Sequence, residues 1–284
     1  MTTSAVTPPA DPPKAPGRAG RDLPAAIAVG LALGAAILGS VYSPYRWTFI
    51  LIVVAAILLG TSEVVRALRT LGAQPPLVPL LVGGAAMVSV AYRYGPDDLV
   101  LAFVLTVLGV VVWRLADPVE GVLRDVTAAV FTAAYVPFLA GFAALMTAPS
   151  DGPRRITAFI ATVVCSDVGG YVAGVLFGKH PMAPSVSPKK SWEGFAGSLL
   201  ACAAAGAVFF VTLFHVAWWQ GVIYGLCVVL SATLGDLGES MIKRDIGIKD
   251  MGTLLPGHGG VMDRLDSLLP TAPLAWLLLL AFVG

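Results

Sequence analysis

The chain has 284 residues, of which 57% are hydrophobic and only 12% are charged, and its net charge at neutral pH is +1. A water-soluble protein of this size has too little interior to hide so much apolar surface. The composition also excludes a disordered chain, a collagen and a disulfide scaffold. We therefore predict an all-α, polytopic membrane protein, because a backbone in lipid must satisfy its own hydrogen bonds and the long apolar runs lack the alternation of barrel strands.

Residues 1–22 are rich in proline and alanine, which indicates a disordered tail on the cytoplasmic side. Nine apolar segments follow, each close to the roughly 20 residues that cross a bilayer. They cover residues 23–42, 47–65, 77–94, 98–115, 126–147, 155–178, 194–214, 218–235 and 268–284. The third and fourth segments could instead form a tighter hairpin, because glycines and a Tyr-Gly-Pro turn interrupt them. We divide the spans into an N-terminal region, 23–150, and a C-terminal region, 151–284, which carries the polar loops and the candidate catalytic residues.

The distribution of lysine and arginine predicts the orientation in the membrane. With nine spans and a cytoplasmic N-terminus, 14 of the 18 basic residues fall in the inner segments and 4 in the outer loops. Cytoplasmic loops normally carry this excess of positive charge. We therefore predict that residues 179–193 and 236–267 face the cytoplasm and that the C-terminus lies outside.

Charged residues concentrate in one segment, 236–266, which holds ten of the 35 in the chain. A solvated loop is the simplest interpretation. However, Asp236, Ser240, Lys243 and Arg244 would share one face of a helix that continues the eighth span. Asp236 lies where the apolar run ends, and a carboxylate at that depth is costly unless it is paired or binds a cation.

The same segment contains a glycine-rich turn and two further carboxylates. Residues 256–260 read PGHGG, and such a turn can bring backbone N–H groups close to phosphate oxygens. Asp263 and Asp266 are spaced i, i+3 with Arg264 between them, so on a helix both carboxylates face one way. Hard oxygen ligands of this kind suit Mg²⁺, although acidic residues are also common in the first turn of a helix.

A second polar segment, residues 177–194, lies between the sixth and seventh spans and on the same predicted side of the membrane. Ser187 and Ser191 flank Lys189 and Lys190, so hydroxyls and ammonium groups together could bind an anion. The alternative is an ordinary positive loop that only fixes orientation. Spacing does not assign which lysine would contact which phosphate.

Two acidic residues lie within or beside the spans. Asp167 is inside the sixth span, and an intramembrane aspartate is a candidate functional residue by default. Glu63, at the cytoplasmic end of the second span, is a weaker candidate that we expect to pair with Arg66 or to reach the interface. A secondary transporter with Asp167 and Asp236 as ion-coupling sites is one alternative function.

Residues 240–266 read SMIKRDIGIKDMGTLLPGHGGVMDRLD, which closely resembles the signature of the phosphatidate cytidylyltransferases, also called CDP-diacylglycerol synthases. Every fixed position of that 27-residue signature is filled. Residues 187–194, SPKKSWEG, resemble a second motif of the family, in which threonine is commoner at the position of Ser191. The complete signature argues against a transporter and against a membrane glycosyl-1-phosphate transferase.

A third resemblance is carried by Asp167 and Tyr171, followed by Gly178 and Lys179. Together the three cover about residues 155–270, whereas the first half of the chain matches only as a set of spans. The resemblance implies a nucleotidyltransferase of phospholipid biosynthesis that converts CTP and phosphatidate into CDP-diacylglycerol and pyrophosphate. It also implies a homodimer in a plasma membrane of the bacterial type, among membrane lipids, with the active site facing the cytoplasm. No basic block indicates a nucleic-acid partner.

The resemblance further implies a metal centre and a set of site residues. The metal is Mg²⁺, alone or with a second cation, and its expected ligands are Asp236, Asp263 and Asp266. The candidate catalytic residues are Asp236, Lys243, Arg244, Asp263, Arg264 and Asp266. The candidate substrate-binding residues are Asp167, Lys179, Ser187, Lys189, Lys190, Ser191, Glu193, Ser240, Lys249, Asp250, His258, Gly259 and Gly260.

Overall fold

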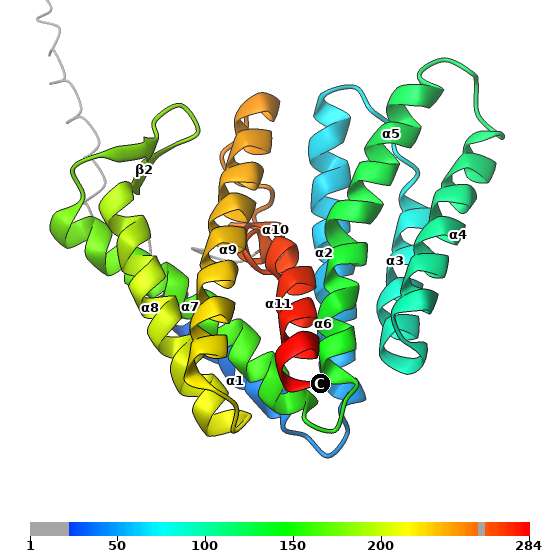
Figure 1. The fold of residues 1–284 in the computed structure, drawn as a ribbon. Helices are drawn as coiled ribbons and strands as arrows, with labels where there is room; N and C mark the ends of the chain where they lie inside the picture. The colour runs from blue at the N-terminus through cyan, green and yellow to red at the C-terminus, as the bar shows by residue number, and fades with distance from the viewer. Residues whose placement is uncertain (1–22, 255–258) are drawn as a thin grey trace, which may run out of the picture.

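The computed structural model describes residues 23–254 and 259–284, with side chains from Gly30 onward. The predicted N-terminal tail and His258 lie outside these residues. Within them, the chain forms a bundle of helical segments (Figure 1). Eight of the described helical segments are long and apolar enough to cross a membrane. The predicted all-α, polytopic membrane class is therefore confirmed.

The helical segments follow the nine predicted spans along the chain, with ends that differ by a few residues in most cases. The N-terminal region contains α1 (Leu23–Val41), α2 (Trp47–Thr70), α3 (Leu77–Tyr94), α4 (Pro96–Arg114), α5 (Val122–Ala133), the π-helical turn η1 (Ala134–Phe138) and α6 (Leu139–Thr147). The C-terminal region contains α7 (Gly152–Phe177), α8 (Trp192–Leu213), α9 (Trp218–Ile246), α10 (Met262–Leu265) and α11 (Leu268–Val283). The fifth span is thus one continuous segment in which η1, with Pro137 inside it, joins α5 to α6.

Two short strands lie in the polar segment between α7 and α8, where no strand was predicted. Strands β1 (Pro181–Ala183) and β2 (Ser187–Ser191) pair antiparallel, with Pro181 opposite Ser191 and Ala183 opposite Ser187. In this hairpin, backbone N–H and C=O groups of the two strands form hydrogen bonds with each other. It also leads directly into the first turn of α8.

Small residues allow α7, α8 and α9 to approach each other closely. A Cβ atom added to Gly169 of α7 would come within 2.9 Å of the Gly197 carbonyl oxygen of α8. Between α8 and α9, Gly206 and Gly221 face each other in the same way. In lipid, association of helices depends on such close packing because the solvent is itself apolar.

The most deeply buried apolar side chains belong to helices from both halves of the chain, including Ile57 of α2, Met87 of α3, Met146 of α6 and Leu279 of α11. This shared core fixes the two halves against each other. The hairpin, the C-terminal end of α9 and the start of α5 lie at one end of the bundle, and the chain's C-terminus lies at the other (Figure 1). The two polar segments of the sequence therefore meet at one end.

Candidate active site

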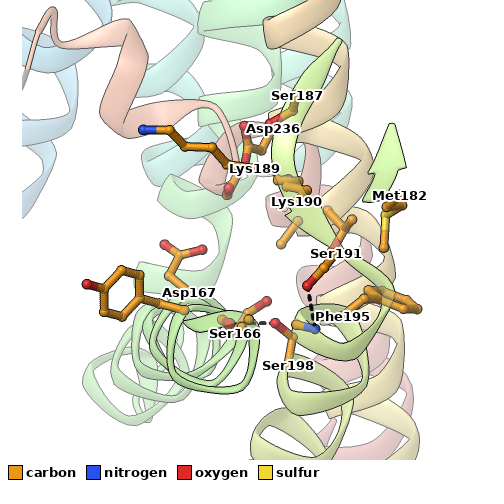
Figure 2. Close-up of a pocket in the computed structure, with 17 residues that line it drawn as sticks. Ser166, Asp167, Met182, Ser187, Lys189, Lys190, Ser191, Phe195, Ser198 and Asp236 are labelled. Atoms are coloured by element: carbon orange, nitrogen blue, oxygen red, sulfur yellow. Dashed lines mark hydrogen bonds and ion pairs between the residues drawn. The ribbon is translucent and has the colours of Figure 1, made fainter. Parts of the chain in front are cut away.

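A cavity of about 360 Å³ lies where α7, α8, α9 and β2 meet. Figure 2 shows the side chains around it, which come from all four elements. Its polar lining consists of Ser166, Asp167, Tyr171, Ser187, Lys189, Lys190, Ser191, Ser198, Thr233, Asp236 and Ser267. The cavity therefore combines lysines, carboxylates and hydroxyls from separate sequence segments between Ser166 and Ser267.

An ion pair links the two polar segments at this cavity. Lys190 Nζ of β2 lies 2.5 Å from Asp236 Oδ2 of α9, and both side chains are partly exposed. Asp236 Oδ1 accepts a weaker hydrogen bond from Ser240 Oγ at 3.4 Å. The energetic cost of a carboxylate at the end of an apolar helix is thus reduced by a lysine from another element.

Asp167 lies on α7 and borders the same cavity (Figure 2). The charged groups that act on its carboxylate are Asp236, Lys190 and Arg264. Two of these are the partners of the ion pair described above. The intramembrane aspartate that the sequence singled out is therefore part of the cavity and not a separate site.

Lys243 of α9 pairs with two carboxylates, Glu239 of the same helix and Asp263 of α10. Its Nζ lies 3.2 Å from Glu239 Oε1 and 2.8 Å from Asp263 Oδ1. Glu239 is fully buried, and apart from this ion pair neither of its oxygens has a hydrogen-bond partner among the described residues. A buried carboxylate with unused oxygens is costly, and it is well suited to attract a cation or a donor group.

Asp263 and Asp266 do not share partners, although their spacing predicted one common face. Besides Lys243, Asp263 accepts backbone N–H groups of Met251, at 3.0 Å, and Gly260, at 2.8 Å. Asp266 lies after the last residue of α10, and its Oδ1 accepts the N–H of Ser267 at 2.6 Å. The helix is interrupted between α10 and α11, so the two carboxylates have different surroundings.

The geometry limits which of the three expected aspartates can bind a metal ion. Within the described part of the chain, no three His, Cys, Asp or Glu side chains are grouped so that they alone would hold a metal ion. Mg²⁺, however, commonly binds through one or two carboxylates together with waters and substrate phosphates. Asp236 and Asp266 fit that pattern, since they influence each other electrostatically and neither is fully engaged by backbone groups. The oxygens of Asp263 are already used.

Two residues of the second motif hold the hairpin against α8. Ser191 Oγ accepts the N–H of Gly194 at 3.1 Å and so caps the first turn of α8. Glu193 accepts the N–H groups of Lys179, at 3.1 Å, and His180, at 3.2 Å, and its Oε1 lies 2.5 Å from His180 Nδ1. Ser191 also lines the cavity, whereas Glu193 acts on the backbone next to it.

The remaining predicted site residues lie around the cavity or outside it. Arg244 is exposed and its Nε donates to the Val186 carbonyl in the turn of the hairpin, at 3.4 Å. Gly259 has a φ of 81°, a conformation that favours glycine. Four exposed residues are absent from the lining of the cavity: Lys179, Lys249, Asp250 and Arg264.

The expectation for Glu63 was wrong. Its side chain is buried and accepts the N–H groups of Val261 and Met262, at 3.1 and 2.8 Å, whereas Arg66 donates to the Ser62 carbonyl. No local pattern predicts a partner about 200 residues away.

Two further residues near the acidic groups were missed. Glu239 is i, i+4 from Lys243, a spacing that could have revealed the pair. Tyr135 of η1 has a buried hydroxyl without a hydrogen-bond partner among the described residues, and the charges of Glu239, Asp266 and Asp236 act on it. A π-helical turn often marks a functional position, but no sequence pattern predicted one here.

Comparison with known proteins identifies the family of the chain. The model of the Cytidylyltransferase family matches residues 24–282. A phosphatidate cytidylyltransferase of Mycobacterium leprae is 47% identical over 92% of this chain and 89% of its own length. That of Mycobacterium tuberculosis (strain H37Rv) is 46% identical over 92% of this chain and 84% of its own length. Phosphatidate cytidylyltransferase 5 of Arabidopsis thaliana, a chloroplastic protein, is 28% identical over 88% of this chain and 69% of its own length. The match therefore includes the N-terminal spans as well as the signature, and the chain belongs to the cytidylyltransferase family.

Proposed function

We propose that this integral membrane protein is a phosphatidate cytidylyltransferase, which converts CTP and phosphatidate into CDP-diacylglycerol and pyrophosphate. The observation that carries the proposal is the Lys190–Asp236 pair, which brings the two polar segments of the family signature to one cavity. Relatives that cover nearly the whole chain bear the same name. The hairpin and the C-terminal end of α9 lie at one end of the helix bundle, where a lipid headgroup would lie (Figure 1).

The reaction needs no nucleophilic side chain. A phosphate oxygen of phosphatidate is already anionic, and it attacks the α-phosphorus of CTP. A new P–O–P linkage forms while the bond from the α-phosphorus to the oxygen shared with the β-phosphorus breaks, and pyrophosphate leaves with that electron pair. The protein has to bring two polyanions together, align them and spread the charge of the transition state.

Residues of the cavity suit these tasks. Lys189 and Lys190 on β2 present ammonium groups, and Ser187 and Ser191 present hydroxyls, all of which can bind phosphate oxygens. Lys243, which is not part of the cavity lining, is held by Glu239 and Asp263, so its position is set before substrate arrives. Preorganised charges of this kind stabilise the transition state because they need little rearrangement.

A divalent cation, Mg²⁺ in our proposal, supplies neutralising charge for the leaving pyrophosphate when it is bound. Asp236 and Asp266 would hold it, and the unused oxygens of buried Glu239 lie near Asp266. Asp263 would act on Lys243 and on the backbone of the signature loop. This assignment keeps two of the three aspartates expected as ligands.

The proposed orientation places the cavity on the cytoplasmic side. The excess of lysine and arginine in the predicted inner segments supports it, and three described parts of these segments, the hairpin, the C-terminal end of α9 and the start of α5, lie at one end of the bundle. A homodimer is the assembly we propose from the family resemblance, and the mass of the solubilised protein would test it.

Position-specific labels in CTP test the reaction. Purified protein in detergent is supplied with phosphatidate, Mg²⁺ and CTP labelled at either the α- or the γ-phosphate. We expect the α label in the lipid product and the γ label in pyrophosphate. An α label that stays in water-soluble products, or a γ label released as orthophosphate, would refute cytidylyl transfer. The Asp236→Asn variant serves as the inactive control.

A further inference from the structure

A carboxylate from the N-terminal half of the chain contacts the loop that carries the family signature. Glu63 of α2 is only 1% exposed, and its oxygens accept the N–H groups of Val261, at 3.1 Å, and Met262, at 2.8 Å. These two amides immediately precede Asp263. Glu63 is therefore bonded to the segment that carries the aspartates of the site.

Two glycines of the signature loop lie against the same carboxylate. A Cβ atom added at Gly252 would overlap Glu63 Oε1, and one added at Gly260 would overlap Glu63 Oε2. Neither glycine has a positive φ, so backbone conformation does not require glycine at these positions. The requirement at Gly252 is space for the Glu63 carboxylate, and at Gly260 it is space for that carboxylate and for the backbone of Gly252.

Asp263 binds the same loop. It accepts the N–H groups of Met251, which precedes Gly252, and of Gly260 itself. The described parts of the loop are thus bonded to two carboxylates, one from α2 and one from α10. Because Asp263 also pairs with Lys243, a shift of this loop would move Lys243 too.

We propose that Glu63 is a positioning residue, which fixes the signature loop so that Asp263 and Lys243 keep their places at the active site. Its effect on turnover rests on the proposed function, whereas its effect on the loop does not. Glu63 itself touches no substrate in this proposal. It gives the N-terminal half of the chain a direct connection to the chemistry.

A purely structural role would have different consequences. A residue that only stabilises the fold would change the amount of folded protein, while each folded molecule would keep its turnover number. A positioning residue changes the turnover number of folded molecules and the protection of the loop, with little change in the apparent KM for phosphatidate. Hydrogen exchange of backbone amides and kinetics per folded molecule separate these outcomes.

The experiment compares Glu63→Gln with Asp125→Asn in full-length protein. Asp125 is a matched control because it is also a buried carboxylate that accepts a backbone N–H, that of Gln74 at 2.7 Å, but it pairs with Arg114 away from the cavity. In Glu63→Gln, an amide N–H₂ replaces one acceptor and faces a backbone N–H. We expect about 10-fold faster exchange at Val261 and Met262 and about a 10-fold lower kcat.

Asp125→Asn should instead speed exchange at Gln74 and leave kcat within about 2-fold of the wild type. Gly252→Ala should reproduce the Glu63→Gln result, because its Cβ displaces the carboxylate without changing any charge. The wild type alone already tests the premise, since the amides of Val261 and Met262 must exchange slowly. Rapid exchange there, or a Glu63→Gln protein with normal kcat, would overturn the proposal. Failure of the wild type to transfer a cytidylyl group would refute the proposed function but not the loop contact.

Discussion

Replacing Lys190 with alanine distinguishes two roles for this residue, binding of substrate and orientation of the protein in the membrane. Its Nζ lies 2.5 Å from Asp236 Oδ2, yet the two side chains are 25% and 33% exposed. A pair this accessible to water contributes about 0–1 kcal/mol to stability. The loss of Lys190 should therefore change the melting temperature very little.

The effect on catalysis should be much larger. If Lys190 donates to a phosphate oxygen, the lost charge-assisted hydrogen bond is worth about 1.5–3 kcal/mol. Each ~1.4 kcal/mol corresponds to a factor of ten, so kcat/KM should fall about 10- to 150-fold. The assay measures initial rates while CTP and phosphatidate are varied separately, because the substrate whose KM rises is the one that Lys190 contacts.

Arg69→Ala is the matched control for this experiment. Arg69 is an exposed basic residue near the end of α2, in a predicted inner segment, and it does not line the cavity. Under the positive-inside interpretation, both variants lose one inner charge and should behave alike. Wild-type kinetic constants for Lys190→Ala with both substrates would remove this lysine from the mechanism.

Three further predictions follow from the same geometry. Asp263→Asn should lower turnover by about 10²-fold or more, because the amide cannot balance Lys243; normal rates at saturating Mg²⁺ would contradict this. Tyr135→Phe should leave thermal stability unchanged but raise the Mg²⁺ concentration for half-maximal activity by about 2- to 10-fold. An unchanged dependence of activity on Mg²⁺ would exclude the Tyr135 hydroxyl from the site. A cysteine at Ser187 in a Cys-free background should resist an impermeant reagent added outside intact cells, and labelling would reverse the proposed orientation.

Hydropathy alone predicted the membrane spans because apolar length is a local property of the chain. The continuation of α9 beyond residue 235 was also predictable, since Asp236, Ser240 and Lys243 repeat at helical spacing. The hairpin was not predicted, because strands of three and five residues carry too few side chains to show an alternating pattern.

The partners of the acidic residues were the least predictable part of the site. Glu63 bonds to residues about 200 positions away, so no spacing rule applies to it. The surroundings of Asp263 and Asp266 differ because the helix is interrupted at Asp266 and Ser267, which spacing alone does not reveal. Glu239 showed a local signal, its i, i+4 relation to Lys243, but the neighbouring aspartates were stronger candidates.

In the free protein, groups that suit an anion are paired with groups that suit a cation. Lys190 pairs with Asp236, and Lys243 pairs with Asp263 and Glu239. An unpaired charge at the edge of a membrane is costly, so an anion that takes Lys190 from Asp236 leaves a carboxylate to be neutralised. A cation bound at Asp236 meets that need and in turn frees the lysine. Binding of the nucleotide and binding of the cation should therefore favour each other by the same factor, since coupling between two ligands is reciprocal.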